Sequence, residues 1–332
     1  MKQHSIYFIH FFCILTVLIF FVGACKSDSS SNQYIAPPPK PKVEVPVFDA
    51  DLAYSFTKKQ TEFGTRVPGT APHKACADWL AEELKSYTPA VIVQSDTVKS
   101  KDGAVFPMYN IIASFEPENK KRILLAAHWD TRRVADKDTK DVDKPIEGAN
   151  DGASGVGVLL EIARLLSTKS ANIGVDIVLF DVEDQGLDGV EDSYALGSQY
   201  WSKNPHKVAY TAEYGILLDM VGAADAIFLQ EVYSLNYAKS IVNKVWNVAH
   251  ELGYKSYFPK EQGGAISDDH YYVNQIAKIP MIDVIHYTKE GGFGKFHHTH
   301  DDDMGIISKS TLKAVGQTVL TVIYRENPPS LQ

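Results

Sequence analysis

Apolar residues in this chain occur in two alternating patterns, short continuous runs and stripes with helical spacing. Continuous β-branched and aliphatic runs are typical of strands that are buried on both faces of a sheet. Apolar residues three or four positions apart are typical of one buried helix face. The pattern predicts strands at residues 91–98, 109–115, 122–127, 175–180, 215–218 and 279–285, and helices at residues 51–63, 72–86, 152–166, 234–252 and 308–325.

This alternation of strands and helices predicts the fold class α/β. We expect a three-layer α/β/α sandwich around a mixed, mostly parallel central sheet, with antiparallel strands near the N-terminal end. Residues 48–332 contain no second low-complexity linker and no obvious internal repeat. We therefore expect them to form one large domain.

The first 47 residues differ from the rest in composition. Lys2 precedes an apolar stretch from residue 6 to residue 24, and Val22-Gly23-Ala24-Cys25 resembles a lipobox. We therefore predict a lipoprotein signal peptide at residues 1–24, with an uncleaved signal anchor as the alternative. Lipidated Cys25 would begin a Ser-, Pro- and Lys-rich tether at residues 25–47. The protein would then be an exported bacterial lipoprotein, anchored outside the cytoplasm at a periplasmic or outer-membrane face.

Charge and cysteine content exclude other classes. The net charge is −8 and no basic run occurs outside the tether, which argues against a nucleic-acid partner. Once the signal peptide is removed and Cys25 is modified, Cys76 is the one cysteine left, so no internal disulfide can form. Because Cys76 lies between two alanines in a helical pattern, we interpret it as a small core residue.

Acidic and histidine-rich motifs punctuate the chain, mostly after predicted strands. Strand carboxyl ends meet at one edge of an open α/β sheet, so these motifs are expected to converge. Carboxylates beside histidine suit zinc, which leaves a coordination position open in catalytic sites. The motifs are Ala127-His128-Trp129-Asp130, Ala149-Asn150-Asp151-Gly152, Phe180-Asp181-Val182-Glu183-Asp184 and His297-His298-Thr299-His300-Asp301-Asp302.

Each motif alone also has a structural interpretation. Asp151 precedes a predicted helix and could cap its N-terminus. A lone His298 in a glycine-rich loop could be a surface residue. Glu183 and Asp184 are harder to explain structurally, because adjacent carboxylates at a strand end need a cation or a proton. The motifs together favour a metal centre.

The chain resembles the zinc aminopeptidase-like exopeptidases and, among them, the bacterial lipoprotein-type glutaminyl cyclases. The resemblance covers nearly all of the mature domain. It extends from Gly64-Thr65-Arg66-Val67-Pro68-Gly69-Thr70 through the motifs above to Leu218-Asp219-Met220-Val221-Gly222, Ser267-Asp268-Asp269-His270 and His298-Thr299, and includes Ala195-Leu196-Gly197-Ser198-Gln199-Tyr200-Trp201.

The resemblance implies a role for individual residues. Asp151, Asp184 and His298 match the ligands of one zinc ion, and Glu183 matches the general acid/base. Asp219 and Asp268 match carboxylates that hydrogen-bond near it. In two-metal relatives, His128 and Asp219 would hold a second zinc with Asp151 bridging. The groups expected to orient the ligand histidines are Asp130 and Asp302.

The substrate pocket is less well specified by the sequence. His297 stands where cyclases usually have Trp, which is a departure from the family pattern. Trp129 could line the cleft or pack beneath it, and Trp201 is expected in the core or at the rim. Residues 291–296 read as a glycine-rich loop whose Phe293 and Phe296 could cover the substrate amide.

The activity that the resemblance implies is cyclisation of N-terminal glutamine of peptides or proteins to pyroglutamate, with release of ammonia. We expect one Zn²⁺ and a monomer. The alternative is a zinc aminopeptidase, with one or two metals, that removes N-terminal residues from peptides. A non-catalytic surface lipoprotein is disfavoured, because neither Glu183 nor any predicted ligand has been lost.

Overall fold

The computed structural model describes residues 43–326 of the chain. The helices are α1 (Ala50–Thr61), α2 (Ala71–Lys85), α3 (Ala153–Thr168), α4 (Leu196–Lys203), α5 (Val232–Glu251), α6 (Asp269–Tyr272) and α7 (Lys309–Arg325), with a π-helix at Val273–Ala277 and a 3-10 helix at Met304–Ile306. The strands are β1 (Val91–Lys99), β2 (Val105–Phe115), β3 (Arg122–His128), β4 (Gly174–Phe180), β5 (Tyr214–Asp219) and β6 (Met281–Ile285).

The strands form one sheet of six in the order β1-β2-β4-β3-β5-β6. β1 pairs with β2, and β2 with β4, in antiparallel fashion, whereas the pairs among β4, β3, β5 and β6 are parallel. The sheet is therefore mixed and mostly parallel, with its antiparallel strands at the N-terminal end, as the sequence predicted.

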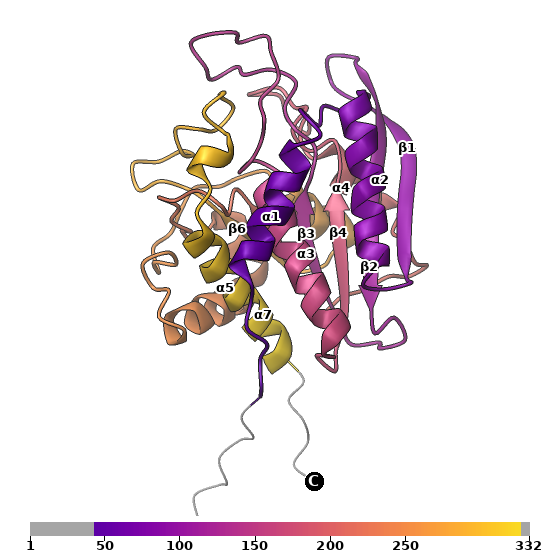
Figure 1. Ribbon diagram of the computed structural model, residues 1–332, viewed down its shortest axis with the longest axis vertical. Helices are drawn as coiled ribbons and strands as arrows, with labels where there is room; N and C mark the ends of the chain where they lie inside the picture. Colours follow the sequence, from indigo (N-terminus) through magenta and orange to yellow (C-terminus); the bar gives the residue numbers. More distant parts are fainter. Residues whose placement is uncertain (1–42, 327–332) are drawn as a thin grey trace, which may run out of the picture. The chain divides into compact units, whose positions relative to one another are not determined.

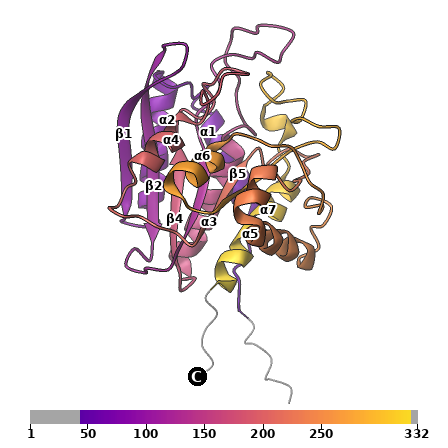
Figure 2. The ribbon, with the colours of Figure 1, turned by 180° about the vertical axis from the view of Figure 1, so that it is seen from behind.

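Helices cover both faces of the sheet (Figures 1 and 2). Side chains alternate along a strand, so β3 sends Ile123 and Leu125 into the core beneath α3, and Leu124 into a second core with Trp201 of α4. Burial on both faces explains why these strands are continuous apolar runs. The predicted three-layer α/β/α fold class is confirmed.

Several predicted features lie at the edges of the described chain. The predicted signal peptide, Cys25 and the tether up to residue 42 lie outside the described residues. Within residues 43–47, which we assigned to the tether, Val43 and Val45 pack against the core. None of the helices in residues 43–326 has the length and apolar character needed to span a bilayer. Cys76 is a fully buried free thiol in α2, as expected of a core residue.

Candidate active site

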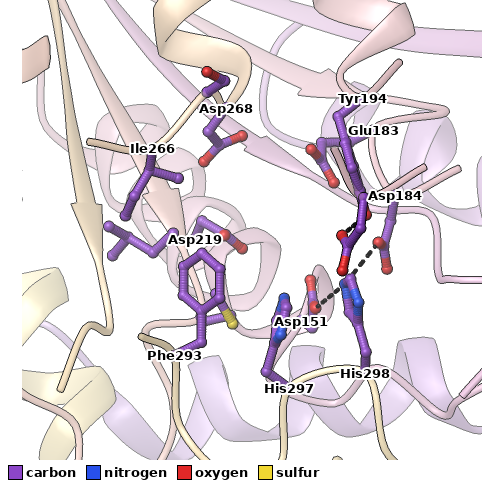
Figure 3. Close-up of a pocket in the computed structure, with 14 residues that line it drawn as sticks. Asp151, Glu183, Asp184, Tyr194, Asp219, Ile266, Asp268, Phe293, His297 and His298 are labelled. Atoms are coloured by element: carbon purple, nitrogen blue, oxygen red, sulfur yellow. Dashed lines mark hydrogen bonds and ion pairs between the residues drawn. The ribbon is translucent and has the colours of Figure 1, made fainter. Parts of the chain in front are cut away.

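The predicted motifs converge on one cavity of about 160 Å³ at the carboxyl ends of the parallel strands (Figure 3). Glu183, Asp184 and Tyr194 lie on one side of the cavity, and Ile266 and Phe293 lie with Asp219 and Asp268 on the other. The sequence-predicted residues that line it are Asp151, Glu183, Asp184, Asp219, Asp268, Phe293, His297 and His298.

The three predicted zinc ligands lie together. His298 Nε2 is 3.1 Å from Asp184 Oδ1 and 3.8 Å from Asp151 Oδ2. Donor atoms of a tetrahedral zinc shell are about 3.4 Å apart, given Zn–N and Zn–O bonds of about 2.1 Å. The second carboxylate oxygen of Asp184 is buried and has no hydrogen-bond partner. The types of these donor atoms, carboxylate oxygen and imidazole nitrogen, are those that zinc binds.

A tight turn before α3 presents the Asp151 carboxylate to the cavity. Gly152 is the N-cap residue of α3, and no side chain caps this end of the helix. The Asp151 carboxylate therefore does not serve as a helix cap. The φ of Gly152 is +98°, and a Cβ there would lie 2.7 Å from the Asp130 carbonyl oxygen. Only glycine fits this turn without strain.

Asp302 supports the same turn rather than a histidine. Its carboxylate accepts hydrogen bonds from the backbone amides of Asn150 (2.7 Å) and Asp151 (2.9 Å). Asn150 Oδ1 in turn accepts from the backbone amides of Gly222 and Ala223 after β5. The expectation that Asp302 orients a ligand histidine is therefore wrong, because its oxygens bind the loop backbone.

Asp130 holds the loop that carries Glu183 and Asp184. It accepts hydrogen bonds from the backbone amides of Glu183 (2.9 Å) and Asp184 (3.3 Å), and lies 3.6 Å from His128 Nδ1. Val182, just before these acids, has φ +54°. A β-branched residue rarely adopts this conformation, and such strain is concentrated at functional sites.

The residue that orients His298 was not predicted from the sequence. Asp136 Oδ1 lies 3.3 Å from His298 Nδ1, and Asp136 also accepts two hydrogen bonds from Arg132. Burial alone would lower the pKa of His298, but Asp184 and Asp136 raise it to about 9. Asp136 follows no strand and belongs to no motif, so only the folded chain reveals its role.

His128 lies on the other side of Asp151. Its Nε2 is 3.0 Å from Asp151 Oδ1 and 3.1 Å from Asp219 Oδ1, so these three side chains form a second group able to hold a metal ion. Burial would lower the pKa of His128, but the carboxylates of Asp130, Asp151 and Asp219 raise it well above its usual value. Without a metal, a proton on His128 offsets the charge of these acids.

The proposed acid/base group faces the cavity in a setting that favours its neutral form. Burial raises the pKa of Glu183 well above its usual value, and Asp268 and Asp184 raise it further while His128 opposes them. Burial likewise raises the pKa of Asp268, and that of Asp219 to about 7. These carboxyl groups share one pocket and influence one another's protonation.

Aromatic and aliphatic side chains also line the cavity. Phe293 lies 4.3 Å from the ring of His297, which stacks on His298 at 3.6 Å between ring centroids. Burial and His298 lower the pKa of His297 to about 3, so its ring is neutral. His297, Asp151 and His298 also form a candidate metal-binding group. Cavity residues absent from our predictions are Asp188, Tyr194, Met220, Ile266, Ser267 and Ile285.

Two predicted pocket residues do not reach the cavity. Trp129 is fully buried, stacks on His73 at 4.5 Å and donates its indole N–H to the Tyr109 carbonyl. Phe296 is 6 % exposed and packs near His286. Both sequence positions adjoin functional histidines, but their side chains point into the core instead.

Comparisons with known proteins agree with this geometry. The model of peptidase family M28 matches residues 110–323. A glutaminyl cyclase from Bacteroides thetaiotaomicron, solved with N-acetylhistamine, is 49% identical, with a TM-score of 0.84 over 86% of this chain and 100% of that one. The Porphyromonas gingivalis glutaminyl cyclase is 50% identical, with a TM-score of 0.82 over 83% of this chain and 98% of that one.

More distant relatives include both cyclases and peptidases. The glutaminyl-peptide cyclotransferase of Boiga dendrophila is 23% identical over 79% of this chain and 77% of its own length. Aminopeptidase YwaD of Bacillus subtilis is 29% identical over 65% of this chain, but the match spans only 44% of that aminopeptidase. The family model covers more than half of the chain, and the site has the donors that zinc requires. The chain belongs to peptidase family M28.

Proposed function

We propose that this protein is a zinc-dependent glutaminyl cyclase that converts N-terminal glutamine of peptides and proteins to pyroglutamate and releases ammonia. The observation that carries the proposal is the cavity itself. Glu183, whose pKa burial raises well above its usual value, lines the same pocket as Asp151, Asp184 and His298. Full-length similarity to bacterial glutaminyl cyclases supports it.

Cyclisation needs little from the protein beyond positioning, charge stabilisation and proton transfer. A zinc ion held by Asp151, Asp184 and His298 would act as a Lewis acid towards the γ-carbonyl oxygen of the substrate glutamine. The apolar side chains of Phe293 and Ile266 would pack against the glutamine side chain and limit its conformations. Holding the amine close to the γ-carbonyl in this way contributes to the rate.

Glu183 supplies the proton transfers. As the α-amine nitrogen bonds to the γ-carbon, Glu183 in its ionised form takes a proton from that nitrogen, and its raised pKa favours this transfer. When the bond between the γ-carbon and the amide nitrogen breaks, Glu183 returns the proton and ammonia leaves. Asp268 and Asp184 favour the protonated form of Glu183, because their charges repel its carboxylate.

A zinc aminopeptidase is the alternative function. The group of His128, Asp151 and Asp219 favours it, since these donor atoms lie within 4.8 Å of one another and could hold a second ion. Peptide hydrolysis uses a metal-activated water, commonly between two metal ions, whereas cyclisation uses an amine from the substrate. We propose one zinc ion per chain in the active cyclase.

Metal stoichiometry and two substrates distinguish these functions. The purified protein would be assayed with a glutamine-initiated peptide and with an aminoacyl amide that does not begin with glutamine. We expect one zinc per chain, pyroglutamate and equimolar ammonia from the first substrate, and no turnover of the second. Free amino acid from the second, with two zinc ions per chain, would establish the peptidase instead.

We also propose that the protein acts as an exported monomer, anchored to a membrane through lipidated Cys25. The apolar stretch and the Val22-Gly23-Ala24-Cys25 motif support this proposal. Expression in a bacterial host would place the wild-type protein in the membrane fraction, and Cys25→Ser would prevent its lipidation. Equal partitioning of the two proteins would contradict the anchor.

A further inference from the structure

A second cavity, of about 390 Å³, opens beside the catalytic cavity. The two cavities share the side chains of Asp188, Tyr194 and Ser267, so they are adjacent parts of one groove. The second cavity lies between the loop of residues 187–194 after β4, the N-terminal end of α5 and the helix α6. A peptide with its glutamine in the first cavity would place its next residues here.

Tyrosines form much of the wall of this second cavity. Tyr233 at the start of α5 contacts Tyr271 of α6, with 4.7 Å between ring centroids. Tyr271 in turn meets the edge of Tyr272 at 5.2 Å. The three rings form a continuous aromatic surface that is fixed by mutual packing. Such surfaces bind cationic side chains through the negative faces of the rings.

The same cavity carries negative charge without a matching cation in its wall. Asp188 is paired with Lys137 and Tyr194. Asp192 accepts a hydrogen bond from Tyr272 but has no ion-pair partner among the described residues. Glu191 is exposed and makes no hydrogen bond or ion pair within residues 43–326. No lysine, arginine or histidine lines the cavity.

We infer that this second cavity binds one of the two side chains after the substrate glutamine and selects lysine or arginine there. The inference rests on the proposed cyclase function. The aliphatic stem of the cation packs on Tyr233 and Tyr271, and its charged end reaches Glu191 and Asp192. Aromatic surface, unpaired carboxylates and continuity with the catalytic cavity together determine this preference.

The test is the ratio of kcat/KM for peptides that differ only after the glutamine. Gln-Lys-Gly-Gly and Gln-Gly-Lys-Gly would each be compared with the peptide that carries Glu at the same position. We expect the better lysine peptide to be favoured about five- to tenfold, and less so at high salt, since exposed charge pairs are weak and screened. Glu191→Gln combined with Asp192→Asn should bring the ratio close to one.

A control variant separates a local site from general attraction of cations to an acidic protein. Glu118 is exposed in the β2–β3 connection, at the opposite end of the sheet, so Glu118→Gln changes charge without touching the groove. The control should leave the ratio unchanged. An equal effect of Glu118→Gln, or equal kcat/KM for lysine and glutamate peptides, overturns the subsite. Failure to cyclise any glutamine peptide instead contradicts the proposed function itself.

Discussion

Carboxylates are buried at both ends of the central strands, but their hydrogen bonding and their pKa shifts differ between the two ends. At the amino end of β4, Asp176 receives hydrogen bonds from Arg122 (2.6 and 2.8 Å), Ser114 (2.5 Å) and Tyr210 (2.8 Å). Burial alone would raise the pKa of Asp176, but Arg122 and Ser114 hold it below its usual value. This carboxylate is fully paired and stays ionised.

At the carboxyl ends of the strands, the buried carboxylate oxygens outnumber the hydrogen-bond donors available to them. Buried oxygen atoms of Asp184, Asp268, Asp269 and Asp283 have no hydrogen-bond partner. Burial raises the pKa of each of these carboxyl groups. Buried charges without partners are costly, so this end needs a metal ion or bound protons to be stable.

The comparison separates carboxylates that stabilise the fold through hydrogen bonds from carboxylates that can bind a ligand or exchange protons. A satisfied carboxylate such as Asp176 has no free lone pair to offer a ligand. The unsatisfied end can take up a cation and exchange protons with a substrate. Substitutions at the two ends should therefore fail in different ways.

The largest effect is expected at the unsatisfied end, from Glu183→Gln. The amide keeps the shape of the side chain but cannot shuttle a proton. We expect kcat to fall about 10²- to 10⁴-fold, the usual contribution of general acid–base catalysis. Zinc content and melting temperature should stay close to wild type, because Glu183 is not a predicted ligand. Turnover near the wild-type rate would remove Glu183 from this role.

At the paired end, Arg122→Met should reduce stability rather than chemistry. The change leaves the Asp176 charge buried without its guanidinium partner, which typically costs about 3–5 kcal/mol. Urea unfolding would measure the loss of free energy. Arg325→Met is the matched control, since Arg325 pairs with Glu251 on the surface and such pairs contribute about 1 kcal/mol or less. Equal losses in the two variants would contradict the comparison.

Asp184→Ala removes a predicted metal ligand. We expect zinc affinity to fall by at least about 100-fold, more than is typical for a residue that only orients a ligand. Activity should be lost in proportion to the zinc that the variant fails to bind. Zinc titration with a competing chelator measures the affinity. The exposed Asp225→Ala provides the control, and zinc binding unchanged by Asp184→Ala would contradict the assignment.

Sequence pattern was sufficient for the sheet and for residues just after its strands. Runs such as 122–127 have no polar residue after the first, and they became strands buried on both faces. The position of Asp184 at the edge of the sheet could be predicted because parallel strands end at the same edge, whereas the ligand roles of Asp151 and Asp184 came from the resemblance and stay predictions. The predicted role of Asp302 was wrong, because a carboxylate in a loop can bind a side chain or the backbone, and sequence does not distinguish these partners.

Side-chain direction in irregular loops was the other part that sequence could not provide. Trp129 and Phe296 neighbour functional histidines but turn into the core. Asp136 orients His298 from a segment without any periodic pattern. These outcomes depend on local dihedral angles, such as φ +57° at His298, that only tertiary contacts determine.

The smallest expected effect is on the pH dependence of stability, through Asp283, a buried carboxyl group next to Asp268. Neither carboxylate oxygen of Asp283 has a hydrogen-bond donor, and burial together with Asp268 and Asp219 raises its pKa well above the usual value. The folded state therefore holds a proton that the unfolded state releases above about pH 4. Stability should fall as the pH rises beyond that value, until the folded-state pKa is passed.

Asp283→Asn has no such proton to lose, so its free energy of unfolding should depend less on pH. We expect the variant to become more stable relative to the wild type as the pH rises from about 5 to about 8. Urea unfolding of the chelator-treated proteins at both pH values measures this gain. Asp176 behaves in the opposite sense, because its lowered pKa makes acid the destabilising condition. If the free energies of unfolding of Asp283→Asn and the wild type changed equally with pH, the comparison would fail. The carboxylates at the carboxyl ends of the strands would then be as well paired as those at the amino ends.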